Sequence, residues 1–283
     1  MKLASFRVAG RTSWGVVEGD SVIDTGAVMN EAFADLTDLI TKEGVSKISS
    51  VLSNASRYKL SGITFLPVIP APSKILCVGL NYEMHRKETG RTEVDHPTIF
   101  ARFANSQIGH LSDIIRPKIS HELDYEGELA IVISRPGRYI KAEDAMSYVA
   151  GFSCYNDVSV RDFQRHTHQF TPGKNFPATG AFGPWLVTPD EMGAIGPQRL
   201  QTRLNGVVVQ DALLSQMIFN IPKQIEYCSS FTQLEPGDVI VTGTPGGVGA
   251  KRQPPLWMKP GDLVEVEIDQ VGILRNHIVA EVA

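Results

Sequence analysis

The sequence predicts a mainly β protein of the α+β class, built on a curled, mostly antiparallel or mixed sheet. Short runs of β-branched and aromatic residues, each bounded by turn residues, recur along most of the 283-residue chain. Helical segments are few and do not alternate regularly with these strands, which argues against a doubly wound parallel sheet. Asn205-Gly206 lies between two apolar runs and predicts a tight hairpin, because this turn needs positive φ at both positions.

The N-terminal part is predicted to form a small α+β domain over residues 1–70. Alternating segments at 2–8, 13–20 and 21–26 are broken by Gly and Asp, as in a small antiparallel sheet. Apolar residues at three- and four-residue spacing predict helices near 31–42 and 45–58. Three prolines then favour an extended linker. The rest of the chain, 71–283, is predicted to be the larger domain.

The larger segment reads mainly as strands. We expect them where β-branched or aromatic runs occur, at 127–134, 148–156, 183–188, 238–244 and 262–269. Helices are expected near 142–147, 158–165 and 221–231, the last with Pro222 in a first turn that tolerates proline.

Composition narrows the class of protein. The net charge of −4 and the lack of a Lys/Arg-rich stripe argue against a nucleic-acid binder. No apolar run approaches the length of a membrane span, and the first residues lack the apolar run of a signal peptide, so we expect a cytosolic protein without a membrane partner. Cys77, Cys154 and Cys228 are widely spaced and fit reduced thiols.

Residues 124–130, DYEGELA, place three carboxylates at alternate positions. In a strand, Asp124, Glu126 and Glu128 would share one face. A solvated acidic face is one interpretation. The other is a cation site, because a glycine within a strand, here Gly127, allows a ligand or another segment to approach closely. Asp157, at the end of a second strand, would add a further carboxylate. On that interpretation Glu126, Glu128 and Asp157 hold Mg²⁺ or Mn²⁺, while Asp124 pairs elsewhere or caps a turn.

Five ordered motifs resemble the fumarylacetoacetate hydrolase family over residues 72–283. They are LNYEMHRKETG (80–90), DYEGELAIVI (124–133), NDVSVRDFQ (156–164), GKNFPATGAFGPWLVTPDE (173–191) and DVIVTGTPGGVG (238–249). The resemblance implies a mixed β-sheet roll, usually a homodimer, with a metal on the same Glu126, Glu128 and Asp157. Members of the family act on small 2-oxo acids and 1,3-dicarbonyl compounds.

The resemblance also implies roles for single residues. His85 and Glu88 match a water-activating pair on a mobile lid, and Lys174 matches the catalytic lysine. Arg161, Gln164 and Thr244 match substrate-contacting positions. Many members have Leu-Lys-Pro before the first acidic motif, where this chain has IFARFANSQIGH (99–110). We expect Arg102 to replace the charge of that lysine. The segment 165–172, with two histidines, matches no assigned role.

The function implied is metal-dependent hydrolysis of a carbon–carbon bond in an acylpyruvate or related β-diketo acid. Three other possibilities stay open. The same site would suit a decarboxylase or isomerase of an unsaturated 2-oxo dicarboxylic acid, or a dehydratase of a 2-keto-3-deoxy sugar acid. A non-catalytic roll that binds a metal or small acid is disfavoured by the presence of both His85 and Glu88.

Overall fold

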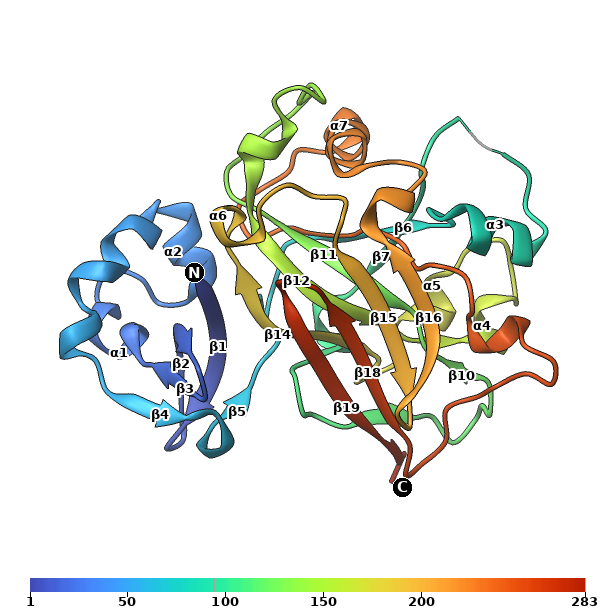
Figure 1. Cartoon of the computed structure of the whole chain (residues 1–283), viewed down its shortest axis with the longest axis horizontal. Helices are drawn as coiled ribbons and strands as arrows, with labels where there is room; N and C mark the ends of the chain where they lie inside the picture. The colour runs from blue at the N-terminus through green and yellow to red at the C-terminus, as the bar shows by residue number, and fades with distance from the viewer. Residues whose placement is uncertain (94, 283) are drawn as a thin grey trace.

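The N-terminal residues form a small lobe beside the body of the molecule in the computed structural model, which describes residues 1–93 and 95–282 (Figure 1). The lobe contains β1 (Lys2–Val8), β2 (Arg11–Glu18), β3 (Ser21–Ile23), α1 (Thr25–Met29), α2 (Leu36–Thr41), η1 (Gly44–Ser50), η2 (Leu52–Asn54), β4 (Arg57–Lys59), η3 (Leu60–Gly62) and β5 (Thr64–Phe65). The three predicted strands are found, but the third ends at Ile23, because Asp24 caps α1 there.

The helix predictions in this lobe are too long. Asp35 accepts a hydrogen bond from the Asp38 amide, so the first of the two predicted helices begins only at Leu36. The second becomes short 3₁₀ turns, where side chains such as Ser50 bond to the backbone carbonyl of Lys47 and compete with a regular helix.

A long mixed sheet runs through both lobes. Its strand order is β4-β3-β2-β1-β14-β12-β11-β17-β6-β7, with β5 and β8 (Gln107–Ile108) at its sides. The strands of the larger lobe are β6 (Ile75–Gly79), β7 (Thr98–Arg102), β11 (Gly127–Ile133), β12 (Val149–Asp157), β14 (Gly180–Val187) and β17 (Val239–Val241). Because β1 pairs with β14, the lobes share a sheet, and the boundary near residue 70 stays a prediction.

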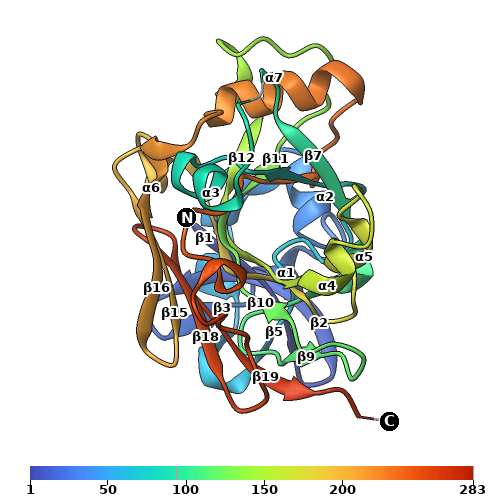
Figure 2. The ribbon, with the colours of Figure 1, turned by 90° about the vertical axis from the view of Figure 1, so that its right-hand side faces the viewer.

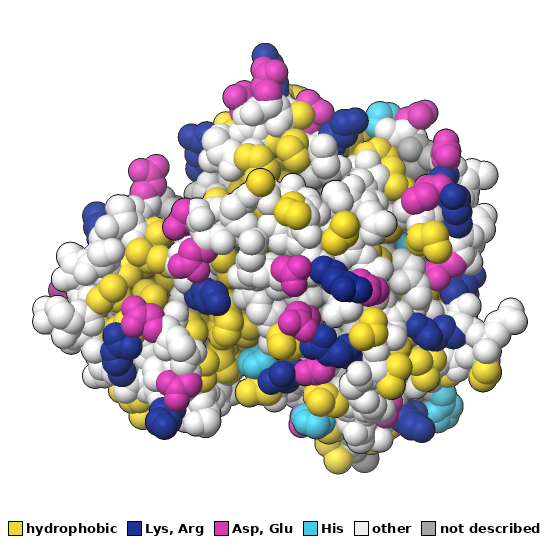
Figure 3. All heavy atoms as spheres, viewed as in Figure 1, with side chains coloured by type: hydrophobic (Ala, Val, Ile, Leu, Met, Phe, Trp, Pro, Cys, Tyr) yellow, Lys and Arg dark blue, Asp and Glu magenta, His cyan; other side chains and the backbone are white. Residues whose placement is uncertain are grey.

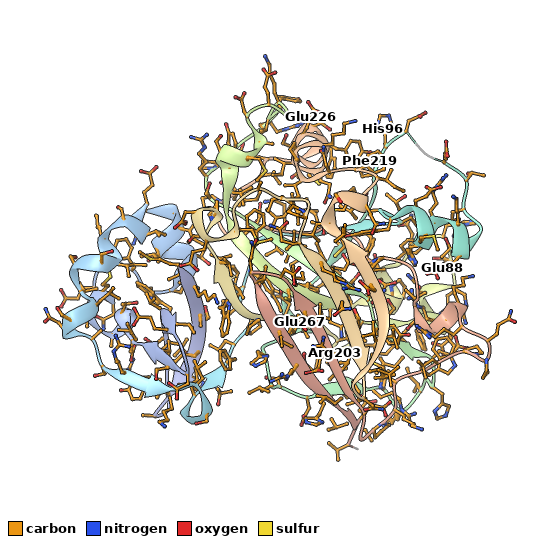
Figure 4. All side chains as sticks on the ribbon, viewed as in Figure 1. Glu88, His96, Arg203, Phe219, Glu226 and Glu267 are labelled. Atoms are coloured by element: carbon orange, nitrogen blue, oxygen red, sulfur yellow. The ribbon has the colours of Figure 1, made fainter. Side chains whose placement is uncertain are left out.

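A second sheet, in the order β16-β15-β18-β19-β9, packs on the first, and together they curl into a roll (Figure 2). Its strands are β9 (Ile114–Arg116), β15 (Arg199–Leu204), β16 (Val207–Leu213), β18 (Leu263–Ile268) and β19 (Gly272–Ala280). Buried residues alternate along β18, and the outer face mixes acidic and basic side chains, including Arg203 beside Glu265 and Glu267 (Figures 3 and 4). The hairpin at Asn205-Gly206 is confirmed, with φ of 52° and 79°. The predicted class, α+β and mainly β, is confirmed.

Short helices and two small strands close the ends of the roll. They are α3 (Glu83–Thr89), η4 (Ala104–Ser106), β10 (Leu123–Asp124), η5 (Ala145–Tyr148), β13 (Ser159–Val160), α4 (Arg161–Gln164), α5 (Thr171–Lys174), α6 (Pro189–Met192), η6 (Leu214–Gln216), α7 (Ile221–Phe231) and η7 (Gly249–Lys251). The helix predicted at 221–231 is confirmed. The helix predicted at 142–147 is a 3₁₀ turn over 145–148. The one predicted at 158–165 is shortened to 161–164, because Ser159 and Val160 pair with β10 instead. No helix in the described ranges is long and apolar enough to cross a membrane.

Candidate active site

The start of β11 and the end of β12 bring three predicted ligands together. Gly127 lies opposite Asn156 in the antiparallel ladder, and the Asp157 amide donates to the Glu126 carbonyl over 2.9 Å. Glu126, Glu128 and Asp157 are buried, and one oxygen of each lies within 4.8 Å of the others. We call these three side chains the carboxylate group. Three carboxylate donors at this spacing are the ligand set that Mg²⁺ and Mn²⁺ favour.

Asp124 does not belong to the carboxylate group, and the chain from Asp124 to Glu128 is not one unbroken strand. Tyr125 and Glu126 lie outside regular strand geometry between β10 and β11. Asp124 accepts from the amides of Gly249 and Ala250 at 2.8 and 2.9 Å, and from Arg161 at 2.8 Å. The expectation that Asp124 pairs elsewhere and caps a turn is therefore confirmed.

Gly127 is required by a close approach from the second sheet. A Cβ built on it would lie 2.1 Å from Thr202 Oγ1. Its amide donates to Gln210 at 3.0 Å and its carbonyl accepts from Thr244 at 3.0 Å. These contacts fix the backbone between Glu126 and Glu128.

Three buried cations face the carboxylate group. Lys174 Nζ lies 2.5 Å from Glu126 and 2.6 Å from Asp157. Arg161 lies 2.7 Å from Glu126, and it also pairs with Asp124. Arg102 is the third cation, and when Asp124, Glu126, Glu128 and Asp157 are all ionised, one negative charge is left over. The site can therefore accept a divalent cation together with an anionic ligand.

Arg102 forms an ion pair with the carboxylate group. Its side chain is fully buried, 2.6 Å from Asp157, and it also donates to Thr179 Oγ1 at 2.7 Å. It is absent from the described residues that line the pocket. In this position Arg102 holds the Asp157 carboxylate, and the substrate contact expected of it stays a prediction.

The buried charges shift the pKa values of this site in opposite directions. Burial raises the pKa of Glu128 well above its usual range, and the negative charges of Asp157 and Glu126 add to the rise. Burial acts against ionisation of Glu126 as well, but Arg161 and Lys174 outweigh it and lower its pKa. Burial would lower the pKa of Lys174, but Asp157 and Glu126 outweigh it and raise that pKa, so Lys174 stays protonated. Glu128 is thus the carboxylate with the least cationic compensation.

His85 and Glu88 form a hydrogen-bonded pair on α3. His85 Nδ1 lies 2.7 Å from Glu88 Oε1, as their spacing of three residues on a helix allows. The second Glu88 oxygen accepts from the Gly247 amide at 2.9 Å, which ties α3 to the loop 243–251. Glu88 lies on α3 at the side of the larger lobe (Figure 4). With Nδ1 engaged, Nε2 is the nitrogen left for a ligand.

A cavity of about 470 Å³ lies beside the carboxylate group and His85. His85, Glu126, Glu128, Arg161 and Lys174 line it. So do Gln164 and Thr244, together with His166 and His168, for which the sequence indicated no role.

Two of the predicted substrate contacts are engaged by the protein itself. The Gln164 carbonyl accepts from Arg161 at 2.9 Å, which leaves its amide N–H groups for a ligand. Thr244 donates to Gly127 and accepts from Gln210, so its hydroxyl supports the backbone.

Sequence reasoning missed the residues that hold the loop. Tyr125 and Arg252 both donate to the Gly247 carbonyl, at 3.0 and 3.2 Å, and Arg252 also donates to Val209 at 2.6 Å. These contacts join distant parts of the chain, and no local spacing signals them.

The protein-family model "Fumarylacetoacetate (FAA) hydrolase C-terminal" matches residues 74–279 of this chain. The chain belongs to the fumarylacetoacetate hydrolase family. A curated relative, oxaloacetate tautomerase FAHD2A, mitochondrial, from Bos taurus, is 43% identical over 221 residues, which are 77% of this chain and 70% of the relative. The family is one of enzymes, and the matched proteins are named as hydrolases, isomerases and tautomerases.

Solved structures share the fold over the whole chain. A fumarylacetoacetate hydrolase from psychrophilic Exiguobacterium antarcticum has a TM-score of 0.85 and 32% identity, covering 99% of this chain and all of its own. A maleylpyruvate hydrolase from Sphingobium sp. SYK-6, in complex with manganese(II) ion and pyruvate, has a TM-score of 0.84 and 26% identity, and both chains are fully covered.

Proposed function

We propose that the protein is a metal-dependent hydrolase of acylpyruvates or related β-diketo acids. Glu126, Glu128 and Asp157 would hold Mg²⁺ or Mn²⁺. The proposal is supported by the buried oxygen donors, by the negative charge left over at the site, and by the manganese and pyruvate in the Sphingobium neighbour. A bound cation would supply Lewis acidity toward the oxygens of a 2-oxo acid.

His85 is the proposed base, and the observation that carries the proposal is that His85, paired with Glu88, lines the same pocket as Glu126 and Glu128. Glu88 fixes the ring so that Nε2 takes a proton from water, and the hydroxide attacks the distal carbonyl carbon of the substrate. The carbon–carbon bond then breaks, its electrons pass to the oxo-acid fragment as an enolate, and a proton returns to carbon. The products are a carboxylic acid and a 2-oxo acid.

Lys174, Arg161 and Gln164 have proposed roles in charge balance and orientation. Lys174 places a fixed positive charge beside the carboxylate group, where enolate charge develops, and preorganised charge of this kind stabilises a transition state. Arg161 and the free Gln164 amide would orient the substrate carboxylate. We assign Thr244 to support of the Gly127 backbone instead of a substrate contact.

Tautomerisation of a 2-oxo dicarboxylic acid is the second candidate. The mitochondrial oxaloacetate tautomerase relative favours it, and the same base could move a proton between carbon and oxygen without attack by water. The homodimer and the cytosolic location expected from the sequence stay predictions.

Turnover in ¹⁸O water separates the two reactions. The magnesium-loaded protein is given acetylpyruvate and, separately, oxaloacetate enriched in its enol form. Hydrolysis would put ¹⁸O into the acetate formed. Tautomerisation would consume the enol band without forming a new acid.

His85→Ala should lower either rate by about 100-fold or more, since general-base groups contribute about 10²–10⁴-fold. His277→Ala, at an exposed histidine of β19, is the matched control and should keep the rate. Full activity in the His85 variant would overturn the proposal.

A further inference from the structure

The buried part of the pocket is lined by both acidic and basic residues, whereas the exposed ionisable residues that line it all have the same sign. The acidic ones, Glu126 and Glu128, are both buried. The exposed ones are all basic: Arg91, Arg165, His166, His168 and Lys251. A cleft with charge of one sign at its mouth attracts ligands of the opposite sign and concentrates them there.

Within the described ranges, the charges of this mouth are unequally compensated. Arg165 pairs with Glu122. Glu93, the acid closest in sequence to Arg91, pairs with Arg86 instead, and Glu88 pairs with His85. Arg91 and Lys251 have no ion-pair partner among the described residues. We call Arg91, Lys251, His166 and His168 the basic rim.

The basic rim is held by three backbone segments around the cavity. Arg91 follows α3, and its amide donates to the Arg86 carbonyl at 3.2 Å. Lys251 ends η7, in the loop that Glu88 ties to α3. The segment after α4 supplies His166, whose ring packs against Phe163 with centroids 4.6 Å apart. Cationic and N–H donor groups thus surround one opening from different elements.

We propose that the basic rim is a subsite for a second carboxylate, so that the enzyme selects 2-oxo acids with an anionic group at the end remote from the carboxylate group. This rests on the proposed function, in which the oxo-acid end enters the buried site. Arg91 and Lys251 attract the remote carboxylate, and the imidazoles offer N–H donors. A substrate ending in an alkyl group would leave these groups without a partner.

A matched pair of unreactive ligands tests the subsite by binding alone. 2-Oxoglutarate and 2-oxopentanoate share the oxo-acid end and differ in whether the chain ends in carboxylate or methyl. Calorimetric titration of the magnesium-loaded protein should give at least tenfold tighter binding of 2-oxoglutarate. The preference should weaken with added salt, because exposed charges are screened.

Charge removal at the rim identifies the residues responsible. The double variant Arg91→Gln/Lys251→Gln should reduce the preference to less than threefold by weakening binding of the diacid. Lys223→Gln, at an exposed lysine of α7, is the control for a lost surface charge and should keep the preference.

Each outcome of these titrations supports or overturns the proposed subsite. Equal binding of the two ligands by the wild-type protein, or an unchanged preference in the double variant, would overturn the subsite and leave the proposed function standing. Failure of both ligands to bind would overturn the proposed function, and the subsite with it.

Discussion

Replacing Gly127 with alanine should destabilise the protein and disturb the carboxylate group at the same time. The new Cβ would lie 2.1 Å from Thr202 Oγ1, and real Cβ contacts are essentially never closer than 3.0 Å. Thr202 is fully buried, so neither partner can move into solvent. Because Gly127 lies between Glu126 and Glu128, a backbone shift that relieves the overlap would move both glutamates.

The size of the effect follows from two opposing contributions. Overpacking of a filled core costs about 1–3 kcal/mol, and an overlap of about 0.9 Å places this site at the upper end. Alanine recovers about 0.5–1 kcal/mol, because it loses less conformational freedom in a strand than glycine. The free energy of unfolding should therefore fall by about 2 kcal/mol. With a urea m-value of about 2–3 kcal/mol/M, the midpoint falls by about 1 M.

Urea denaturation of a set of variants tests this reasoning. Gly127→Ala/Thr202→Ala removes the clashing oxygen and should be more stable than the sum of the two single changes by at least about 1 kcal/mol, since contacting residues couple on this scale. Gly127→Ala/Thr202→Val keeps a group of similar size at that place and should not recover. A Gly127→Ala protein as stable as wild type would refute the close-approach account.

Three further changes probe other parts of the structure. Burial and nearby Arg275 lower the pKa of His110 to about 4. Between pH 6.5 and 4 the unfolded chain therefore binds the proton more readily, and the free energy of unfolding falls as the pH falls. In urea titrations it should be about 2 kcal/mol lower at pH 5 than at pH 7 for wild type, and His110→Gln should lose visibly less. Glu88→Gln should lower kcat by about 10-fold or more while leaving manganese affinity unchanged, since it weakens the orientation of His85; equal kcat would remove Glu88 from the mechanism. Arg102→Met should cost about 3–5 kcal/mol by calorimetry, because it leaves a buried carboxylate with one cation fewer, and a loss below 1 kcal/mol would contradict its supporting role.

The sequence predicted best where a short stretch of chain decides the outcome. The turn at Asn205-Gly206 and the helix at 221–231 depend on local preferences, and both are found where expected. The carboxylate group was predictable because acids at the ends of two strands converge once those strands pair.

Features that depend on contacts between distant segments were missed. Asp124 accepts hydrogen bonds from the loop amides at 249 and 250, and Arg102, at the end of β7, donates to Asp157. No residue pattern near these positions encodes such partners.

The central claim is that one divalent cation is held by Glu126, Glu128 and Asp157. Titration of the purified protein with Mn²⁺, followed by electron paramagnetic resonance of the free ion, tests it most directly. We predict one bound ion per chain in wild type and in His85→Ala, and loss of this site in Glu128→Gln. Equal binding by wild type and Glu128→Gln, or no binding by wild type, would contradict the account.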